Sequence, residues 1–291
     1  MSEPAAYSRS VVGIAAAIAV ALAAAALAIS LTACGGGENE PPARLLLEAD
    51  LSELPPEADP DEAMDTLVAI LKRRADSFGL PEVEIGREDS SLVAVTLSDD
   101  LPAEDARQLM EVTALLELRQ PVLDENGDIE CLSLEGTRLS VPRENITYAT
   151  DDPGGRPMPR CVVSEGQAGE IIWEPAVGSD SESQTEDAPP VTLGPVTAVV
   201  DRTEAPVVII GLTPLGAQIL ESTSRQLVGL PLGIFLDGEL LAGPTIQEAI
   251  ATGNLPIAGL TLNDANFLAA QLEGGPLPVP IKGSSSEGTA E

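Results

Sequence analysis

The clearest periodic pattern in the chain lies between Asp59 and Gly79, where apolar residues recur at intervals of three and four. This spacing gathers them on one face of an α-helix. Asp59 is suited to cap that helix, Pro60 to occupy its first turn, and Gly79 to end it. The apolar face consists of Met64, Leu67, Val68, Leu71, Ala75 and Phe78.

Shorter patterns surround this helix. The run from Arg44 to Ala49 predicts a strand before it, and further strands are expected at 83–86, 92–97 and 114–119, with a second helix at 102–112. The resulting order is strand, helix, strand, strand, helix, strand. That order is typical of a ferredoxin-like split βαβ unit, in which helices cover one face of an antiparallel sheet. We therefore predict the α+β fold class.

The segment 120–204 has a different character, because it is rich in Gly, Pro and Ser and carries only short strand-like runs. Within it, the acidic stretch 178–190 lacks large apolar residues and is predicted to be a disordered loop. The regular pattern returns over 205–281, and a polar, loose tail is expected at 282–291. The elements expected in the second regular block are a strand at 206–212, a helix at 215–228 capped by Thr213, a hairpin turning at Asp237-Gly238, and a helix at 262–273 capped by Thr261.

The N-terminal region predicts the compartment. An uncharged, Ala-rich run covers 11–31 and is followed by Leu31-Thr32-Ala33-Cys34 and three glycines. Small residues before a Cys resemble the lipobox of a bacterial lipoprotein, which implies a signal peptide over 1–33, a lipid on Cys34 and a tether over 34–43. The alternative is an uncleaved transmembrane anchor, because 21 residues are long enough to span a bilayer. Either interpretation predicts an extracytoplasmic protein at the cell membrane.

Charge and composition exclude several functions. The chain has 47 Asp and Glu residues, 15 Lys and Arg residues and no His, which gives a formal net charge of −32. Phosphate backbones repel such a chain, so nucleic-acid binding is not expected. Without His there is no Ser-His-Asp or Cys-His machinery. We predict a protein that is not an enzyme and needs no cofactor. The basic run Lys72-Arg73-Arg74 fits either an anion site or stem-packed cations at a helix end.

Two further sequence features have both a chemical and a structural interpretation. Cys131 and Cys161 have no neighbouring metal ligands, and an oxidising compartment favours a structural disulfide over two free thiols. Asp124, Asn126, Asp128, Glu130 and Glu135 partly match a calcium-binding loop. However, Ile129 stands where that loop needs Gly, so a hairpin turn at Asn126-Gly127 is the favoured interpretation.

Two blocks of sequence resemble the first extracytoplasmic domain of SecD, the accessory subunit of the bacterial protein-export translocase. In the first block the resemblance rests on LKRRADSFGLPEVEI, LVAVTL and AEDARQLMEVTALLELR, which fall between Met64 and Arg119. In the second it rests on LTPLGAQ, LGIFLDGELLAGPTIQEAI and LTLNDANFLAAQLEGGPLPVPI, between Pro206 and Ile281. The family's GLDLxGG entry motif is absent, and Glu38–Ala43 stands in its place. The membrane acid and base implied in proton coupling also have no counterpart.

The resemblance implies a division of the chain. Residues 44–119 and 205–281 are expected to form a discontinuous base, and 120–204 an inserted, β-rich head that contacts emerging polypeptide. The expected partners are the Sec translocon or exported polypeptides. Apolar residues of the head offer a candidate polypeptide-binding face, although such residues more often form a small satellite core. The candidates are Val162, Val163, Ile171, Ile172 and Trp173.

Two functions remain open from the sequence. The favoured one is a SecD-like envelope lipoprotein that assists protein export by holding emerging polypeptide, without proton coupling of its own. The alternative is an envelope lipoprotein that uses the same fold to bind a solute or calcium.

Overall fold

A computed structural model describes residues 43–98, 100–149, 156–164, 167–174, 196–203 and 205–287 of the chain. The predicted signal peptide, the tether, Cys34 and the acidic stretch 178–190 lie outside the described residues. Within the described part, none of the helices combines the length and the apolar character needed to cross a membrane.

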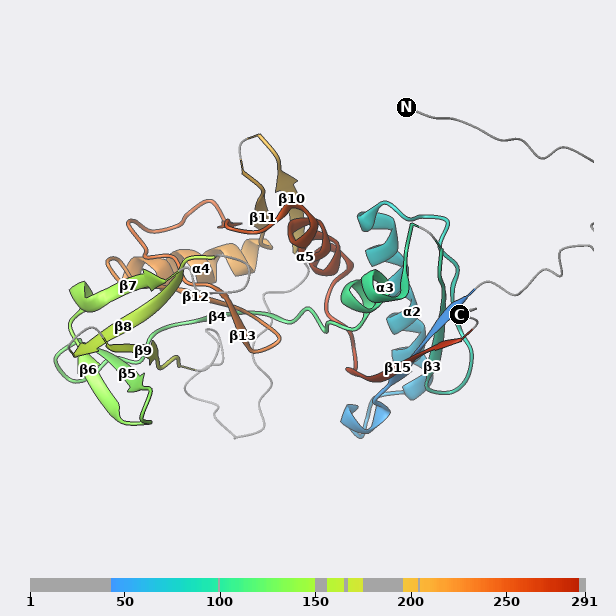
Figure 1. Cartoon of the computed structure of the whole chain (residues 1–291), viewed down its shortest axis with the longest axis horizontal. Coiled ribbons are helices and arrows are strands. Elements are labelled where there is room, and N and C mark those ends of the chain that lie inside the picture. The colour runs from blue at the N-terminus through green and yellow to red at the C-terminus, as the bar shows by residue number, and fades with distance from the viewer. Residues whose placement is uncertain are drawn as a thin grey trace, which may run out of the picture. The chain divides into compact units, whose positions relative to one another are not determined.

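The first subdomain comprises residues 43–113 and 275–287 and is built on a four-stranded antiparallel sheet (Figure 1). Helix α2 (Pro60–Phe78) and helix α3 (Ala103–Met110) pack against it. Its strands, in spatial order, are β15 (Ile281–Glu287), β1 (Arg44–Ala49), β3 (Leu92–Thr96) and β2 (Ile85–Arg87). The short 3-10 helix Leu51–Glu53 follows β1. The predicted caps form, because Asp59 accepts a hydrogen bond from the backbone N–H of Asp61 and Gly79 ends α2 with φ +98°.

One strand of this sheet differs from the prediction. The expected fourth strand of the ferredoxin-like unit, 114–119, leaves the sheet, and β15 lies beside β1 in its place. The expected loose tail, 282–291, is therefore a paired strand as far as Glu287. The sequence gives no sign of this strand, because β15 is an edge strand of mostly exposed Gly and Ser residues and its position depends on backbone pairing with β1.

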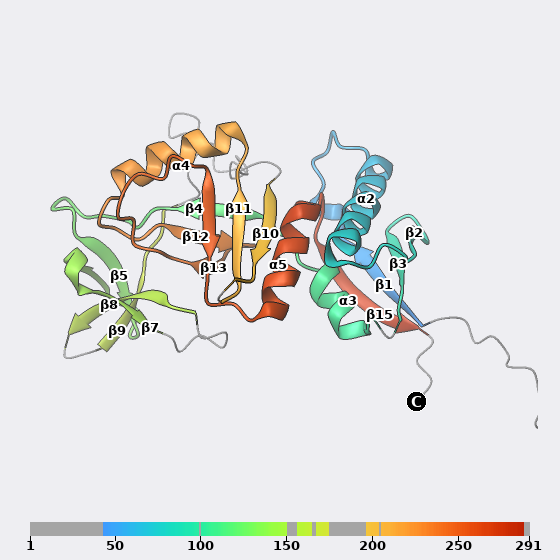
Figure 2. The ribbon, with the colours of Figure 1, turned by 90° about the horizontal axis from the view of Figure 1, so that it is seen from above.

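The second subdomain comprises residues 114–274 and holds three antiparallel sheets with two helices (Figure 2). Helix α4 spans Pro214–Gln226 and helix α5 spans Leu262–Gly274. The first sheet contains β13 (Glu239–Ala242), β12 (Gly233–Leu236) and β4 (Leu116–Arg119). The second contains β10 (Thr197–Asp201), β11 (Val207–Gly211) and β14 (Asn254–Ile257). The third contains β6 (Arg138–Val141), β5 (Ile129–Ser133), β9 (Gln167–Ile171), β8 (Met158–Ser164) and β7 (Ile146–Ala149), with the 3-10 helix Arg143–Asn145 before β7.

The described residues of the predicted head, 120–204, do not form a core of their own. Ile129 and Ile171 of the five-stranded sheet belong to the same buried cluster as Leu220 of α4 and Ile234 of β12. In addition, β10 lies within the predicted head but pairs with β11 of the predicted base. The chain therefore passes between its two cores near residues 113 and 275, instead of at 119 and 205.

Helix α5 contributes to both cores. Leu268 and Leu272 are buried in the core of the second subdomain, whereas Phe267 is buried in the core of the first. The Phe267 ring stacks on Phe78 of α2 with 4.6 Å between ring centroids. Strand β4 also pairs with β12. The early and late blocks of the sequence therefore share sheets and buried contacts.

Candidate functional site

The junction between the two subdomains is organised by Arg74, which is fully buried at the side of α2. Its guanidinium donates hydrogen bonds to five backbone carbonyl oxygens. The distances are 3.3 Å to Leu109, 3.4 Å to Met110, 2.6 Å to Val112, 3.1 Å to Thr113 and 3.0 Å to Gly275. These carbonyls lie at the C-terminal ends of α3 and α5, where helix dipoles favour a cation. Arg74 thus joins the two places where the chain crosses between subdomains.

Asp237 holds the same crossing from the other subdomain. It sits in the β12–β13 turn, and its carboxylate accepts hydrogen bonds from the backbone N–H groups of Ala114 at 3.0 Å and Leu115 at 2.7 Å. Burial lowers the pKa of Arg74 to about 10, and the Asp237 carboxylate opposes that shift. Arg74 therefore remains charged at neutral pH.

In the basic run Lys72-Arg73-Arg74, the two arginines bind backbone carbonyl oxygens of the protein itself. Arg73 donates to the carbonyl oxygen of Gly274 at 2.8 Å, next to the carbonyls bound by Arg74. Gly274 is required at this point, because a Cβ atom there would lie 2.3 Å from Cγ of Arg74. The sequence signal for this junction is the run Lys72-Arg73-Arg74, but it does not reveal which cation is buried.

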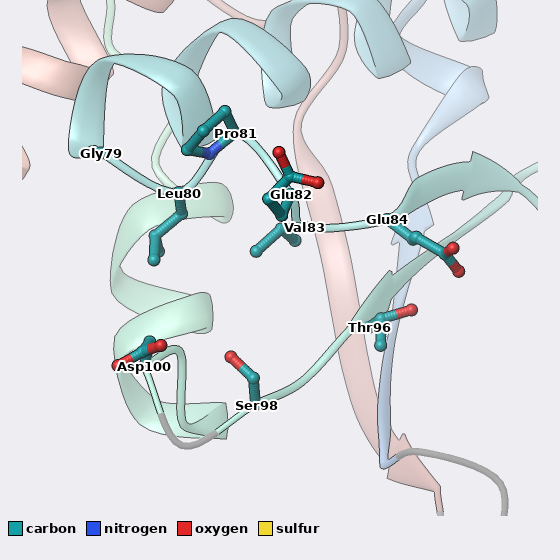
Figure 3. A pocket seen from close by; sticks show the side chains of 9 residues that line it. All are labelled: Gly79, Leu80, Pro81, Glu82, Val83, Glu84, Thr96, Ser98 and Asp100. Atoms are coloured by element: carbon teal, nitrogen blue, oxygen red, sulfur yellow. The ribbon is translucent and has the colours of Figure 1, made fainter.

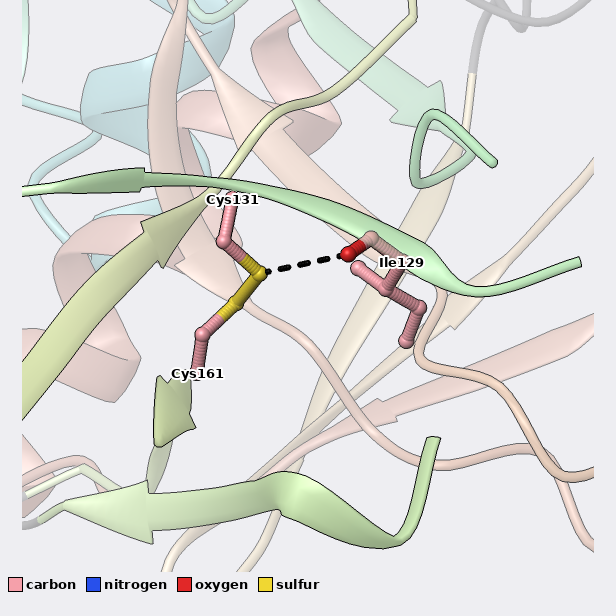
Figure 4. Close-up of a disulfide and its surroundings, with 3 residues drawn as sticks. All are labelled: Ile129, Cys131 and Cys161. Carbon is pink, nitrogen blue, oxygen red and sulfur yellow. Dashed lines mark hydrogen bonds between the residues drawn. A yellow bond between two sulfur atoms is a disulfide. The ribbon is translucent and has the colours of Figure 1, made fainter. Parts of the chain in front are cut away.

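The predicted disulfide between Cys131 and Cys161 is formed (Figure 4). The two residues lie on β5 and β8, which flank β9 in the five-stranded sheet, and their Cα atoms are 6.4 Å apart. Both side chains are fully buried. Closing a loop of this length contributes about 3–4 kcal/mol on the chain-entropy model. The bond therefore stabilises the sheet from inside the core.

The acidic segment after β4 forms the favoured hairpin turn. The Asp124 carboxylate accepts hydrogen bonds from the backbone N–H groups of Asn126 at 2.8 Å and Asp128 at 3.0 Å. These bonds, that of Asp128 foremost, lower the pKa of Asp124. Glu130 faces Arg138 at 3.1 Å. Within the described residues no three acidic, Cys or His side chains, including Glu135, cluster as a metal site.

The predicted apolar face of the head is largely internal. Ile171 is 6% exposed and belongs to the core. Trp173 is half-buried and meets Phe235 edge-on, with 5.6 Å between ring centroids. Val162 and Ile172 are also half-buried, and the side chain of Val163 lies outside the described part. Of the four described side chains, Ile171 is therefore a core residue, and the other three are only partly open to solvent.

A different apolar feature of the same sheet is open to solvent. Leu134, in the turn between β5 and β6, is 80% exposed, and Leu132 and Leu139 on the two flanking strands are 42% and 38% exposed. We call these three residues the leucine hairpin. Sequence reasoning missed them, because alternation along a strand does not tell which face remains uncovered. In the strand register Leu139 lies opposite Cys131 and Leu132 lies opposite Arg138, so the two strand leucines project from opposite faces of the hairpin, with Leu134 at its tip. Exposed apolar side chains around the tip of a hairpin are typical of surfaces that contact another chain.

Comparisons with known proteins identify one matching family model and several similar chains. The family model described as "SecDF, P1 head subdomain" matches residues 192–279. Protein translocase subunit SecD of Calditerrivibrio nitroreducens is 29% identical over 223 residues, which is 76% of this chain and 40% of that protein. Protein translocase subunit SecDF of Thermus thermophilus is 41% identical over 86 residues, which is 29% of this chain and 12% of that protein.

The chain is similar to SecD over about three quarters of its length. Among solved structures, the crystal structure of SecDF in a super-membrane-facing form matches with a TM-score of 0.51 and 25% identity over 84% of this chain and 30% of that one. The fold is thus α+β with several antiparallel sheets, as in SecDF. The chain spans about two fifths of the length of the curated SecD relatives that head this comparison.

The range matched by the SecDF head model differs from the range of the predicted head. The matched range, 192–279, lies almost wholly in the second subdomain and overlaps the predicted second half of the base. Most of the predicted head, 120–204, falls outside the match. The division seen in the structure, at residues 113 and 275, fits the matched range better than the predicted one does.

Proposed function

We propose that this protein assists protein export by holding unfolded polypeptide through the leucine hairpin of its second subdomain. The proposal rests on one observation above all, which is the exposure of Leu132, Leu134 and Leu139 around the tip of a hairpin whose strand β5 is anchored in a core by Ile129 and Cys131. Apolar side chains bind unfolded chains without sequence preference, because the hydrophobic effect is not directional.

The names of the relatives support the export context. Those relatives are translocase subunits, and the second subdomain carries the match to the SecDF head. We therefore infer that the second subdomain takes the place of a head and the first that of a base. The partner is a polypeptide emerging from the Sec translocon, and the protein performs no catalysis and has no proton coupling of its own.

The proposed location is the outer face of the cytoplasmic membrane, with Cys34 as the lipid-modified anchor. The charge of −32 supports this role, because mutual repulsion keeps copies of the protein apart while the leucine hairpin stays exposed. The alternative function of calcium binding gains no support from the acidic segment, since Asp124 is engaged by its own turn.

A holding assay tests the proposal. The purified full chain is mixed with a chemically unfolded exported protein, and aggregation is followed by light scattering. We expect the wild-type protein to suppress aggregation and the variant L132S/L134S/L139S to lose most of that effect, because the apolar contact area is removed.

The matched control is Leu215→Ser, since Leu215 is 66% exposed on α4 but lies outside the hairpin. The control variant should suppress aggregation as the wild type does. Equal loss in the control and the hairpin variant, or no suppression by the wild type, would contradict the proposal.

A further inference from the structure

The first subdomain has a surface hollow of about 530 Å³ beside the C-terminal end of α2. Its apolar part is formed by Leu80, Pro81 and Val83, which follow directly after α2. In Figure 3 the side chains of Leu80 and Val83 point into the hollow from one wall, and Ser98 points into it from the other. The hollow therefore has an apolar lining that is accessible from solvent.

Three carboxylates surround this apolar lining. They belong to Glu82 and Glu84 on one wall and Asp100 on the other, and none of the described residues that line the hollow is Lys or Arg. Within the described part of the chain, none of the three carboxylates forms an ion pair. Each of the three side chains belongs to an exposed residue. The hollow thus brings together three carboxylates that form no ion pair among the described residues.

Neighbouring carboxylates of the same subdomain are neutralised. Glu88 pairs with Arg44, Asp61 pairs with Arg87 at 2.5 Å, and Glu48 pairs with Lys282 at 3.0 Å. The adjoining hollow shares Glu82 and Glu84 with this one and is also lined by Arg44, Arg87 and Lys72. The two arginines are engaged in the pairs above, whereas Lys72 forms no ion pair in the described part of the chain. Glu82, Glu84 and Asp100 are thus among the carboxylates of this subdomain that form no ion pair in the described part of the chain.

An apolar lining with a carboxylate rim is complementary to a lysine or arginine side chain. Such a side chain packs its aliphatic stem on apolar surface while its charged end remains at the rim. We propose that this hollow binds a lysine or arginine side chain of an extended polypeptide segment from another chain. The sheet arrangement supports an extended partner, because β2 is the outermost strand and presents a backbone edge next to Glu84.

This site goes beyond the proposed function, because it lies in the first subdomain and uses charge, whereas the leucine hairpin lies in the second and is apolar. The two sites fail independently. A protein without holding activity can still bind cationic segments here, and loss of this site leaves the hairpin intact.

Fluorescence anisotropy tests the site directly. The probe is the fluorescein-labelled peptide Gly-Lys-Val-Lys-Gly with an amidated C-terminus, titrated with the purified full chain at physiological ionic strength. We expect saturable binding, and we expect the double variant E82Q/D100N to raise the dissociation constant about fivefold, the sum of two modest exposed charge contacts. The variant Val83→Ser should also weaken binding, because the lysine stem loses its apolar contact.

Two controls separate the hollow from the general negative charge of the protein. The variant E125Q/E144Q removes the same charge from exposed positions in the second subdomain and should leave the dissociation constant unchanged. A peptide with acetyl-lysine at both lysine positions keeps the stems but loses the charges and should not bind. Equal weakening by E125Q/E144Q, binding of the acetylated peptide with wild-type affinity, or the absence of saturable binding would overturn the proposal. The thermal midpoint of each variant verifies that it is folded.

Discussion

Arg74 is the residue on which the junction depends most. A single guanidinium binds carbonyl groups from the ends of two helices, so the desolvation of the buried charge is offset by five hydrogen bonds. A lysine has three donors on a flexible stem and lacks the planar fork that reaches several carbonyls at once. The position therefore selects arginine and not positive charge alone.

The variant Arg74→Met tests this role. It removes the cation and leaves the carbonyl oxygens of Val112 and Thr113 without their donor, so we expect unfolding to become easier by about 3–5 kcal/mol. Urea denaturation measures the change. The control is Arg73→Met. In the described part of the chain the Arg73 guanidinium donates hydrogen bonds only to the Gly274 carbonyl, and the residue is exposed, so we expect a loss of stability of about 1 kcal/mol or less. Similar losses in both variants would contradict the role of Arg74.

Among the elements, α5 has the most demanding position, because opposite faces of one helix are buried in two cores. Ala265, Leu268 and Leu272 face the second core, and Phe267 and Ala270 face the first. Thr261 caps the helix by accepting a hydrogen bond from the N–H of Asp264 at 3.2 Å. The helix therefore links the two cores directly.

The variant Phe267→Ala is expected to destabilise the protein by about 3–5 kcal/mol, because it leaves a cavity beneath Phe78 in the first core. Leu262→Ala provides the control, since Leu262 is 46% exposed at the start of the same helix, and its expected loss is within about 0.5 kcal/mol. The denaturant midpoints of the two variants measure both losses of stability. A loss below about 1 kcal/mol for Phe267→Ala would show that α5 does not belong to the first core.

Elements with strong local signals were predictable from the sequence. The bounds of α2 and α5, their caps at Asp59 and Thr261, and the hairpin at Asp237-Gly238 agree with the structure. The strands that pair with β4 and β15 could not be predicted from the sequence. Strand pairing depends on backbone groups that are distant in the chain, and these give no periodic pattern of apolar residues. The burial of Ile171 and the exposure of Leu134 also escaped prediction, since both depend on which face of a sheet another layer covers.

At the scale of the whole molecule, the two subdomains are expected to unfold together, because α5 and Arg74 are shared by both. Trp173 is the single tryptophan of the chain and reports on the second subdomain by fluorescence. Far-ultraviolet circular dichroism reports largely on helices, of which the 19-residue α2 of the first subdomain is the longest described. The urea unfolding transition followed by Trp173 fluorescence should therefore coincide with the one followed by circular dichroism. Separate midpoints would show that the subdomains are independent modules.

Contact between the leucine hairpin and polypeptide in transit is tested most directly by crosslinking in living cells. A photoreactive phenylalanine analogue is placed at position 134 of the full chain, and at position 215 as the control. We expect irradiation during active export to crosslink position 134, but not position 215, to polypeptides in transit. These crosslinked products should disappear when export is blocked. Equal labelling from both positions, or products at position 134 that persist without export, would contradict the proposed contact.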